Sequence, residues 1–204
     1  MQHQAGTAPR VPADERRQAL VRAAYHQIAA RGFEGLRTRE VAQEVGLNVA
    51  TLHYYFPTKE SLIGGVVEHA MTRFQTTLAP HGRPGDELRA HLLAVATLLR
   101  REPELGQVMA ELALRSTRDP SIEALLGATQ QGGQHAVRVL LRRAATAGRV
   151  RPELDSDAAA ALIISVLGSM TLPVLGEAAR HDGALRELLR WLGLEPATES
   201  QSTD

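Results

Sequence analysis

The amino-acid sequence predicts an all-α fold, and three observations support this. Ala and Leu, two of the strongest helix formers, are the commonest residues, with 31 and 28 of the 204 positions. β-Branched and aromatic residues, which favour strands, are comparatively scarce, and aromatic residues make up only 3% of the chain. Pro and Gly divide the chain into helix-length segments, and no alternating apolar pattern typical of strands is present.

Start and stop signals in the sequence place nine helices. Gly32 is expected to end the first, Thr38 to be the N-cap of the second, and Asn48 to be the N-cap of the third. Pro57 and Thr58 precede the fourth. The expected helices cover residues 13–31, 39–45, 49–55 and 59–78, and then approximately 87–101, 104–116, 121–147, 156–172 and 183–193.

Composition along the chain indicates two domains between two polar tails. The residues 80–86, PHGRPGD, form the clearest linker within the helical part. The expected organisation is a disordered tail over 1–12, a three-helix DNA-binding domain over 13–58, a helical regulatory and dimerisation domain over 59–194, and a second disordered tail over 195–204.

Charge and residue content exclude several classes of protein. The 23 basic and 23 acidic residues cancel, so there is no bulk charge to indicate a nucleic-acid coat or a membrane partner. The absence of Cys excludes a disulfide scaffold, thiol catalysis and Cys-ligated metal. No apolar run reaches 18 residues, and the N-terminal residues do not resemble a signal peptide. We therefore expect a cytoplasmic protein with no membrane segment.

The segment 38–56, TREVAQEVGLNVATLHYYF, has the spacing of a helix-turn-helix. Ala42 is small enough for two helices to cross closely, and four positions later Gly46 can adopt the positive φ of a sharp turn. Val41, Val45, Leu47 and Leu52 fall where two short crossing helices would share a core. In this motif the second helix enters the DNA major groove. An ordinary corner between two helices has the same pattern and remains an alternative at this point.

Two features around this segment favour DNA. Five of the seven aromatic residues lie within residues 25–56, close to Thr and His side chains that can donate hydrogen bonds to phosphate. Residues 1–60 carry eight basic and six acidic groups, while 61–204 carry 15 and 17. That asymmetry is slight, but its sign suits DNA binding at the N-terminal end.

The stretch from Ala19 to Leu62 resembles the N-terminal domain of the tetracycline-repressor (TetR/AcrR) family. The resemblance rests on AA…ARGF in the first helix, TREVAQEVGL in the second, and TLHYYFPTKESL across the third and fourth. The rest of the chain matches in length, in helical content and in the phrase RPELDSDAAAALI. The resemblance implies a homodimeric transcriptional regulator, usually a repressor, that a small ligand releases from its operator.

The resemblance also implies which residues contact double-stranded DNA. Arg39 matches a position that can reach a base, and Arg recognises guanine through O6 and N7. Val49 and Ala50 can offer only apolar contact to thymine methyl groups. One departure is His53, where the family most often has Tyr; His can still donate a hydrogen bond at this position. The expected DNA-binding residues are Thr38, Arg39, Asn48, Val49, Ala50, Thr51, His53, Tyr54, Tyr55 and Lys59, the chain's one Lys.

These residues have structural roles as alternatives. Thr38 and Asn48 can be helix caps alone, and Arg39 can be a solvated surface residue. Tyr54, Tyr55 and Phe56 are successive on one helix, so they cannot all face DNA. Phe56 is expected in the core, whereas Tyr54 could lie either in the core or at the rim.

The middle of the helix expected over 121–147 is unusually small and polar for an otherwise apolar stripe. Two successive glycines, Gly132 and Gly133, weaken a helix, so either a ligand cavity or a close helix crossing or bend is expected there. A cavity would suit a largely apolar small-molecule effector, although Met and Phe at helical spacing are often plain core. Its expected lining is Met71, Phe74, His91, Val95, Val108, Met109, Leu112, Thr129, Gln130, Gly133 and Gln134.

The segment 158–170, AAAALIISVLGSM, is apolar on all sides and needs cover on two of them. A second subunit could cover one side, giving a twofold four-helix interface with the helix near 183–193. The alternative is a central helix buried within one chain. The expected interface residues are Ile163, Leu167, Met170, Leu188, Leu189, Trp191 and Leu192.

Catalysis is not supported by any motif. The eight His residues are scattered, and there is no HExxH, no GxSxG and no phosphate-binding loop. Glu153, Asp155 and Asp157 precede a helix and suit its N-terminal dipole. We therefore expect no enzyme, no metal and no cofactor. The partners expected are an inverted-repeat operator, an effector and a second copy. An activator or a DNA-independent adaptor with the same fold is the alternative.

Overall fold

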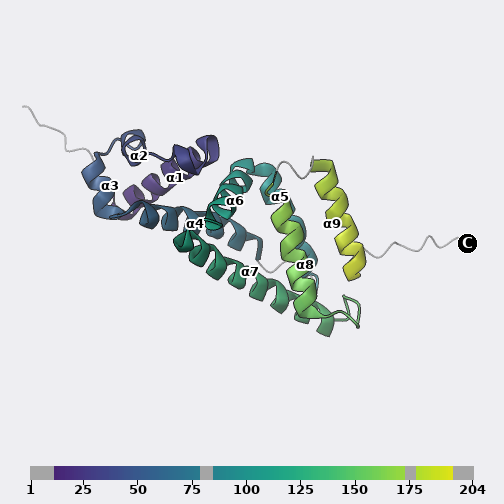
Figure 1. The fold of residues 1–204 in the computed structure, drawn as a ribbon. Coiled ribbons are helices and arrows are strands. Elements are labelled where there is room, and N and C mark those ends of the chain that lie inside the picture. The colour runs from purple at the N-terminus through teal and green to yellow at the C-terminus, as the bar shows by residue number, and fades with distance from the viewer. Residues whose placement is uncertain (1–11, 79–84, 173–177, 195–204) are drawn as a thin grey trace, which may run out of the picture. The chain divides into compact units, whose positions relative to one another are not determined.

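The computed structural model describes residues 12–78, 85–172 and 178–194 (Figure 1). These residues form nine α-helices and no strands, which confirms the all-α prediction. The helices are α1 (Ala13–Arg31), α2 (Thr38–Glu44), α3 (Val49–Tyr55), α4 (Lys59–Gln75), α5 (Glu87–Arg101), α6 (Pro103–Ser116), α7 (Pro120–Thr146), α8 (Ser156–Ser169) and α9 (Ala178–Leu192). Short 3₁₀ turns lie at η1 (Phe33–Gly35) and η2 (Thr76–Leu78). The two predicted tails and most of the predicted linker fall outside the described residues, apart from Pro12, Gly85 and Asp86.

The chain divides into two compact units, Met1–His69 and Ala70–Asp204, so the division falls within α4. The first part of α4 belongs to the first unit because its side chains complete that unit's core. Leu62, Ile63, Val66 and Val67 are each at most 2% exposed. The domain division that the sequence suggests, at residue 58, precedes these residues.

The first unit packs α1 against α2, and α2 against α3. Its core consists of large apolar side chains from each of these helices and from α4. Gly65 on α4 allows a close approach of neighbouring side chains, because a Cβ atom at this position would lie 2.8 Å from Val21 Cγ2 on α1. The most deeply buried side chains of this unit include Leu20, Ile28, Val41, Leu52, Phe56 and Ile63.

In the second unit, α5 is the central helix, since it packs against α6, α7, α8 and α9. The helix α7 also packs against α6 and α8. Arg73 near the end of α4 forms a two-pronged ion pair with Glu102 at the start of α6. Among the described residues, no helix has both the length and the apolar character needed to cross a membrane.

The start of α2 differs from the sequence prediction. Thr38 is the first helical residue, and Arg37 takes the extended conformation of the N-cap, at φ −122° and ψ 109°. No side chain caps the helix. The physical reason lies outside the segment, since the Arg37 N–H donates to Oε1 of Gln27 on α1 at 3.3 Å. A tertiary contact therefore sets the boundary.

Candidate nucleic-acid interface

The predicted helix-turn-helix forms between α2 and α3. Gly46 has φ +73°, a left-handed conformation that favours glycine, and its N–H donates to the Gln43 carbonyl oxygen at 3.0 Å. The Leu47 N–H donates to the Ala42 carbonyl oxygen at 2.8 Å, which closes the turn. Val41, Ala42 and Leu52 are almost fully buried where the helices meet, whereas Val45 and Leu47 are half-buried.

The cap of α3 confirms the role predicted for Asn48. Its Oδ1 accepts hydrogen bonds from the Thr51 N–H at 2.7 Å and from the Thr51 hydroxyl at 3.0 Å. A seven-residue helix is marginal by itself, so the cap matters for the order of this segment. Thr51 is thus oriented by Asn48 at the first turn of α3.

The exposed face of α3 separates cleanly from its buried face. Leu52 and Phe56 lie in the core, and Phe56 is 2% exposed as expected. Tyr54, which the sequence placed either in the core or at the rim, is 81% exposed and packs edge-on against Tyr55. Of the expected DNA-binding residues, Arg39, Asn48, Ala50, His53 and Tyr54 are exposed, and Thr38, Val49, Thr51, Tyr55 and Lys59 are half-buried.

A reciprocal cap begins α4 next to this face. The Thr58 hydroxyl accepts from the Ser61 N–H at 3.1 Å, and the Ser61 hydroxyl accepts from the Thr58 N–H at 3.2 Å. Lys59 is the first residue of the helix, and its Nζ lies 5.1 Å from the centre of the Phe33 ring. The ring holds the ammonium group near the surface of the first unit.

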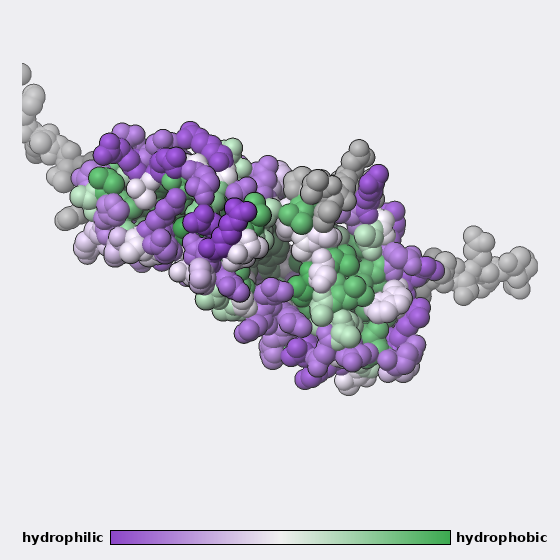
Figure 2. Space-filling view, viewed as in Figure 1, coloured by the Kyte–Doolittle hydropathy of each residue, from purple (hydrophilic) through white to green (hydrophobic). Residues whose placement is uncertain are grey.

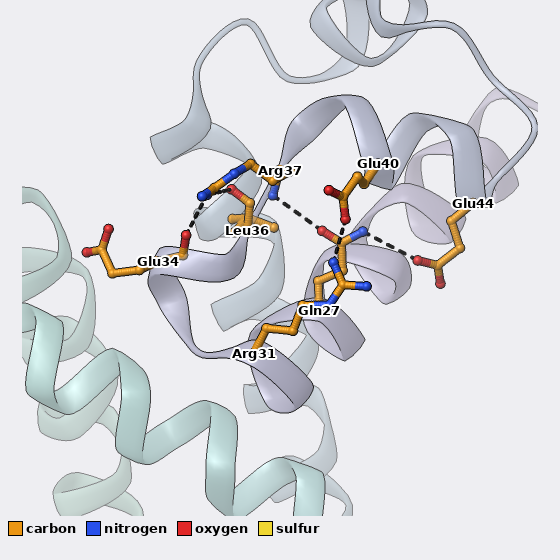
Figure 3. A network of polar contacts seen from close by, with 7 residues as sticks. All are labelled: Gln27, Arg31, Glu34, Leu36, Arg37, Glu40 and Glu44. Carbon is orange, nitrogen blue, oxygen red and sulfur yellow. Dashed lines mark hydrogen bonds and ion pairs between the residues drawn. The ribbon is translucent and has the colours of Figure 1, made fainter.

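A polar network that sequence inspection did not identify joins α1 to both ends of α2 (Figure 3). Gln27 on α1 is 7% exposed; its Oε1 accepts from the Arg37 N–H, and its Nε2 donates to Glu44 Oε2 at 3.5 Å. Arg31 and Glu40 form an exposed ion pair at 2.5 Å between the same helices. A polar residue on the inner face of α1 was the available sequence signal for this network.

The residues expected to line a ligand cavity lie in the second unit or on the part of α4 that belongs to it. His91 is 8% exposed, and its Nδ1 lies 2.9 Å from the Thr77 hydroxyl and 3.2 Å from the Thr77 carbonyl oxygen. Burial lowers the pKa of His91, and the hydrogen bond to Thr77 opposes that shift. Val95, Val108 and Leu112 are buried, Met71, Phe74, Met109, Thr129 and Gln134 are half-buried, and Gln130 and Gly133 are exposed.

No close helix crossing among the described residues explains the glycine pair of α7. A Cβ atom at Gly133 would meet Ile164 Cδ1 on α8 at 3.9 Å, which is an ordinary contact. A Cβ atom at Gly132 would meet nothing within 4 Å. Packing against the described residues therefore requires a glycine at neither position.

The residues expected at a dimer interface divide into buried and accessible ones. Ile163, Leu167, Leu188, Leu189 and Leu192 are at most 8% exposed within a single chain, so their side chains already form part of the second unit's core. Met170 is half-buried, and Trp191 is 48% exposed. Other apolar residues of α8 and α9 are accessible: Leu162 is 41% exposed, and Ala158, Ala161 and Ala184 are also exposed. Leu172, just after α8, is 37% exposed.

Two protein-family models match the chain. The model described as bacterial regulatory proteins of the tetR family matches residues 20–66. The model described as the tetracyclin repressor-like C-terminal domain matches residues 78–169. The first match covers the α2–α3 motif, and the second covers the whole of the helices α5–α8.

Individual relatives and solved structures agree with this assignment. The nucleoid occlusion factor SlmA of Haemophilus influenzae (strain PittGG) is 28% identical over 49% of this chain and 48% of its own, so the chain spans about half of that curated relative. The tetracycline repressor protein class C of Escherichia coli is 32% identical over 42% of this chain and 38% of its own. A TetR-family regulator structure from Rhodococcus sp. has the same fold, with a TM-score of 0.78 and 19% identity over 88% of this chain and 98% of its own.

The two family models and the shared fold lead to one conclusion: the chain belongs to the tetracycline-repressor family of bacterial regulatory proteins.

Proposed function

We propose that the protein is a repressor that binds an inverted-repeat operator as a homodimer and leaves it when a small, largely apolar effector binds. The observation that carries the DNA-binding part is the capped helix α3, which presents an exposed face, together with the exposed Arg39 on α2. The repressor function itself is supported by relatives such as the HTH-type transcriptional repressor AcnR of Corynebacterium jeikeium, which is 23% identical over 83% of this chain.

In this proposal, α3 reads the major groove and the surrounding residues bind phosphate. Arg39 is exposed and has the donors that recognise guanine. Val49 and Ala50 at the start of α3 would contact thymine methyl groups. Asn48 would lie at the base edges, while Thr38, Thr51, His53, Tyr55 and Lys59 would hold phosphate oxygens and Tyr54 would lie at the rim of the contact.

A twofold dimer through α8 and α9 would place two α3 helices on successive half-sites. Support comes from the accessible apolar side chains of these helices, which Figure 2 shows gathered over one face. Leu162 and Trp191 are large apolar residues that one chain leaves 41% and 48% exposed. The proposed interface therefore uses these accessible residues, with Met170 at its edge, and not the five leucine and isoleucine side chains that the chain buries itself.

The effector would bind beside the middle of α7. Gln130, Gly133 and the buried Val137 and Leu140 follow one another at intervals of three, four and three residues, so all four lie on one face of the helix. This face is buried at Val137 and Leu140 but remains accessible at Gln130 and Gly133. Such accessibility suits a binding space lined by Met71, Phe74, Met109, Thr129 and Gln134, with His91, Val95, Val108 and Leu112 behind them.

A binding and reporter experiment tests this function. Wild-type protein should bind the DNA upstream of its own gene in a gel-shift assay, and its expression should lower transcription from that DNA fused to a reporter. Arg39→Ala should lose both effects, and Arg142→Ala, which removes an exposed Arg of α7, should retain them. Binding without a fall in transcription would contradict the repressor, and no binding by wild type would contradict the DNA-binding function.

The dimer has its own test in sedimentation equilibrium. Leu162→Glu combined with Trp191→Glu should give monomers with weak operator binding, whereas Leu114→Glu should remain dimeric. Leu114 is a matched control because it is 65% exposed on α6, away from α8 and α9 in the sequence. A wild-type monomer at micromolar concentration would contradict the proposed interface.

A further inference from the structure

The buried amide of Gln27 has both of its polar ends bonded to α2. Within residues 12–69, it is the one buried side chain with an amide or charged group. Its two partners belong to opposite ends of α2, since Arg37 is the N-cap and Glu44 is the last helical residue. Figure 3 shows the amide lying between them.

The chemistry of the two partners fixes the orientation of this amide. A backbone N–H can only donate, so the group facing Arg37 must be Oε1. A carboxylate can only accept, so the group facing Glu44 must be Nε2. The flipped amide would place a donor against the N–H and an acceptor against the carboxylate. Gln27 therefore fits α2 in one arrangement only.

The recognition helix α3 depends on α2 for its position. It is seven residues long, and it is joined to α2 through the buried contacts of Val41, Ala42 and Leu52. The ion pair Arg31–Glu40 also joins α1 to α2, but its side chains are 60% and 47% exposed, and such pairs hold geometry weakly. A binding element generally requires placement within about 0.5 Å, and buried hydrogen bonds to its support provide it.

We propose that Gln27 is a positioning residue for DNA recognition: by bonding both ends of α2, it sets the placement of α3 that base reading requires. This inference rests on the proposed function. Gln27 does not touch DNA in this account, so it acts on sequence discrimination and leaves phosphate binding in place. Phosphate contacts carry no sequence information, so they contribute to the binding of operator and unrelated DNA alike.

The test compares affinity for the operator selected by wild type with affinity for a scrambled duplex of equal length. Gln27→Glu keeps an acceptor for the Arg37 N–H but places a carboxylate against Glu44, so the ratio of the two affinities should fall by about tenfold or more, the value of one lost base contact. The double variant Gln27→Glu/Glu44→Gln restores the hydrogen bond with its donor on the other helix. Its ratio should return to within about twofold of wild type.

Two further variants keep the test independent of folding and charge. Gln27→Leu removes both hydrogen bonds without repulsion, so it should lower the ratio while circular dichroism shows a native helix content. Glu40→Gln removes one negative charge from α2, as Glu44→Gln does, and should leave the ratio unchanged because it lies outside the Gln27 bonds.

The outcomes separate the two claims. An unchanged ratio in Gln27→Leu and Gln27→Glu, or a double variant that stays as low as Gln27→Glu, would overturn the positioning role while wild type still discriminates. A wild type that binds the two duplexes equally would overturn the proposed function itself. A lower ratio of operator affinity to scrambled-duplex affinity in both single variants, with recovery in the double variant, would support the inference.

Discussion

Two adjacent glycines of α4 have opposite expected responses to the same substitution. A Cβ atom at Gly64 would meet nothing within 4 Å, whereas one at Gly65 would lie 2.8 Å from Val21 Cγ2 and 3.3 Å from Phe56 Cε1. Both residues lie inside a helix, where Ala in place of Gly contributes about 1 kcal/mol. Gly64→Ala should therefore increase the free energy of unfolding by about 1 kcal/mol.

At Gly65 the gain in helix propensity is opposed by overpacking. The nearest atom belongs to Val21, a β-branched side chain with little freedom to turn away. Overpacking a filled core costs about 1–3 kcal/mol, so the net change for Gly65→Ala ranges from about zero to a loss of about 2 kcal/mol. The two variants should differ by about 1–3 kcal/mol.

Calorimetry or urea unfolding measures this difference, with each variant serving as the control for the other. At about 2–4 °C per kcal/mol for a chain of this size, the central value of about 2 kcal/mol corresponds to melting temperatures about 4–8 °C apart. The order should be Gly64→Ala above wild type, and Gly65→Ala at or below it. A Gly65→Ala protein as stable as Gly64→Ala would refute the packing of α4 against α1 and α3.

Three other substitutions test local features. Asn48→Ala should lower the free energy of unfolding by about 0.5–2 kcal/mol, and Asn48→Ser, which can still cap α3, should lower it less; equal losses in urea titration would argue against the cap. Lys59→Ala should weaken binding to operator and to unrelated DNA alike, and should reduce the slope of log affinity against log salt by about one; an intact slope with lost specificity would exclude a phosphate contact. Burial lowers the pKa of His91 below 6.5, and this effect outweighs the hydrogen bond to Thr77, which raises the pKa. As the pH falls, the unfolded chain therefore takes up the proton before the folded chain does. The free energy of unfolding should decrease as the pH drops below about 6.5. His91→Gln should make this fall smaller in melts between pH 7.5 and 5.5, and an unaltered pH dependence would show that His91 is not its source.

Local signals were enough to predict α1, α3 and the turn between α2 and α3. Gly32 ends α1, and Asn48 caps α3 with its own side chain, so both boundaries depend on residues within a few positions. The start of α2 is different, because a hydrogen bond to Gln27, ten residues earlier, makes Arg37 the N-cap in place of Thr38. The spacing of residues along the sequence does not indicate that contact.

The sequence also does not indicate which face of a uniformly apolar helix is buried. Residues 158–170 are apolar on all sides, so the pattern cannot show which side packs within the chain. The structure buries Ile163 and Leu167 and leaves Leu162 accessible. Likewise, the run of aromatic residues at the end of α3 does not indicate whether Tyr54 is buried or exposed. Tyr54 is exposed because Leu52 and Phe56 occupy the buried face of the helix.

The central claim is that a dimer reads DNA through α3 and Arg39, and selection of binding sites from random DNA tests it most directly. Wild type should select an inverted repeat whose half-sites lie about one helical turn, or a multiple of one, apart. Each half-site should contain one strongly preferred guanine with thymine beside it, and Arg39→Ala should relax the preference at that guanine alone, at a cost of about 1–3 kcal/mol per half-site. A non-palindromic consensus, or an Arg39→Ala consensus identical to that of wild type, would contradict the account.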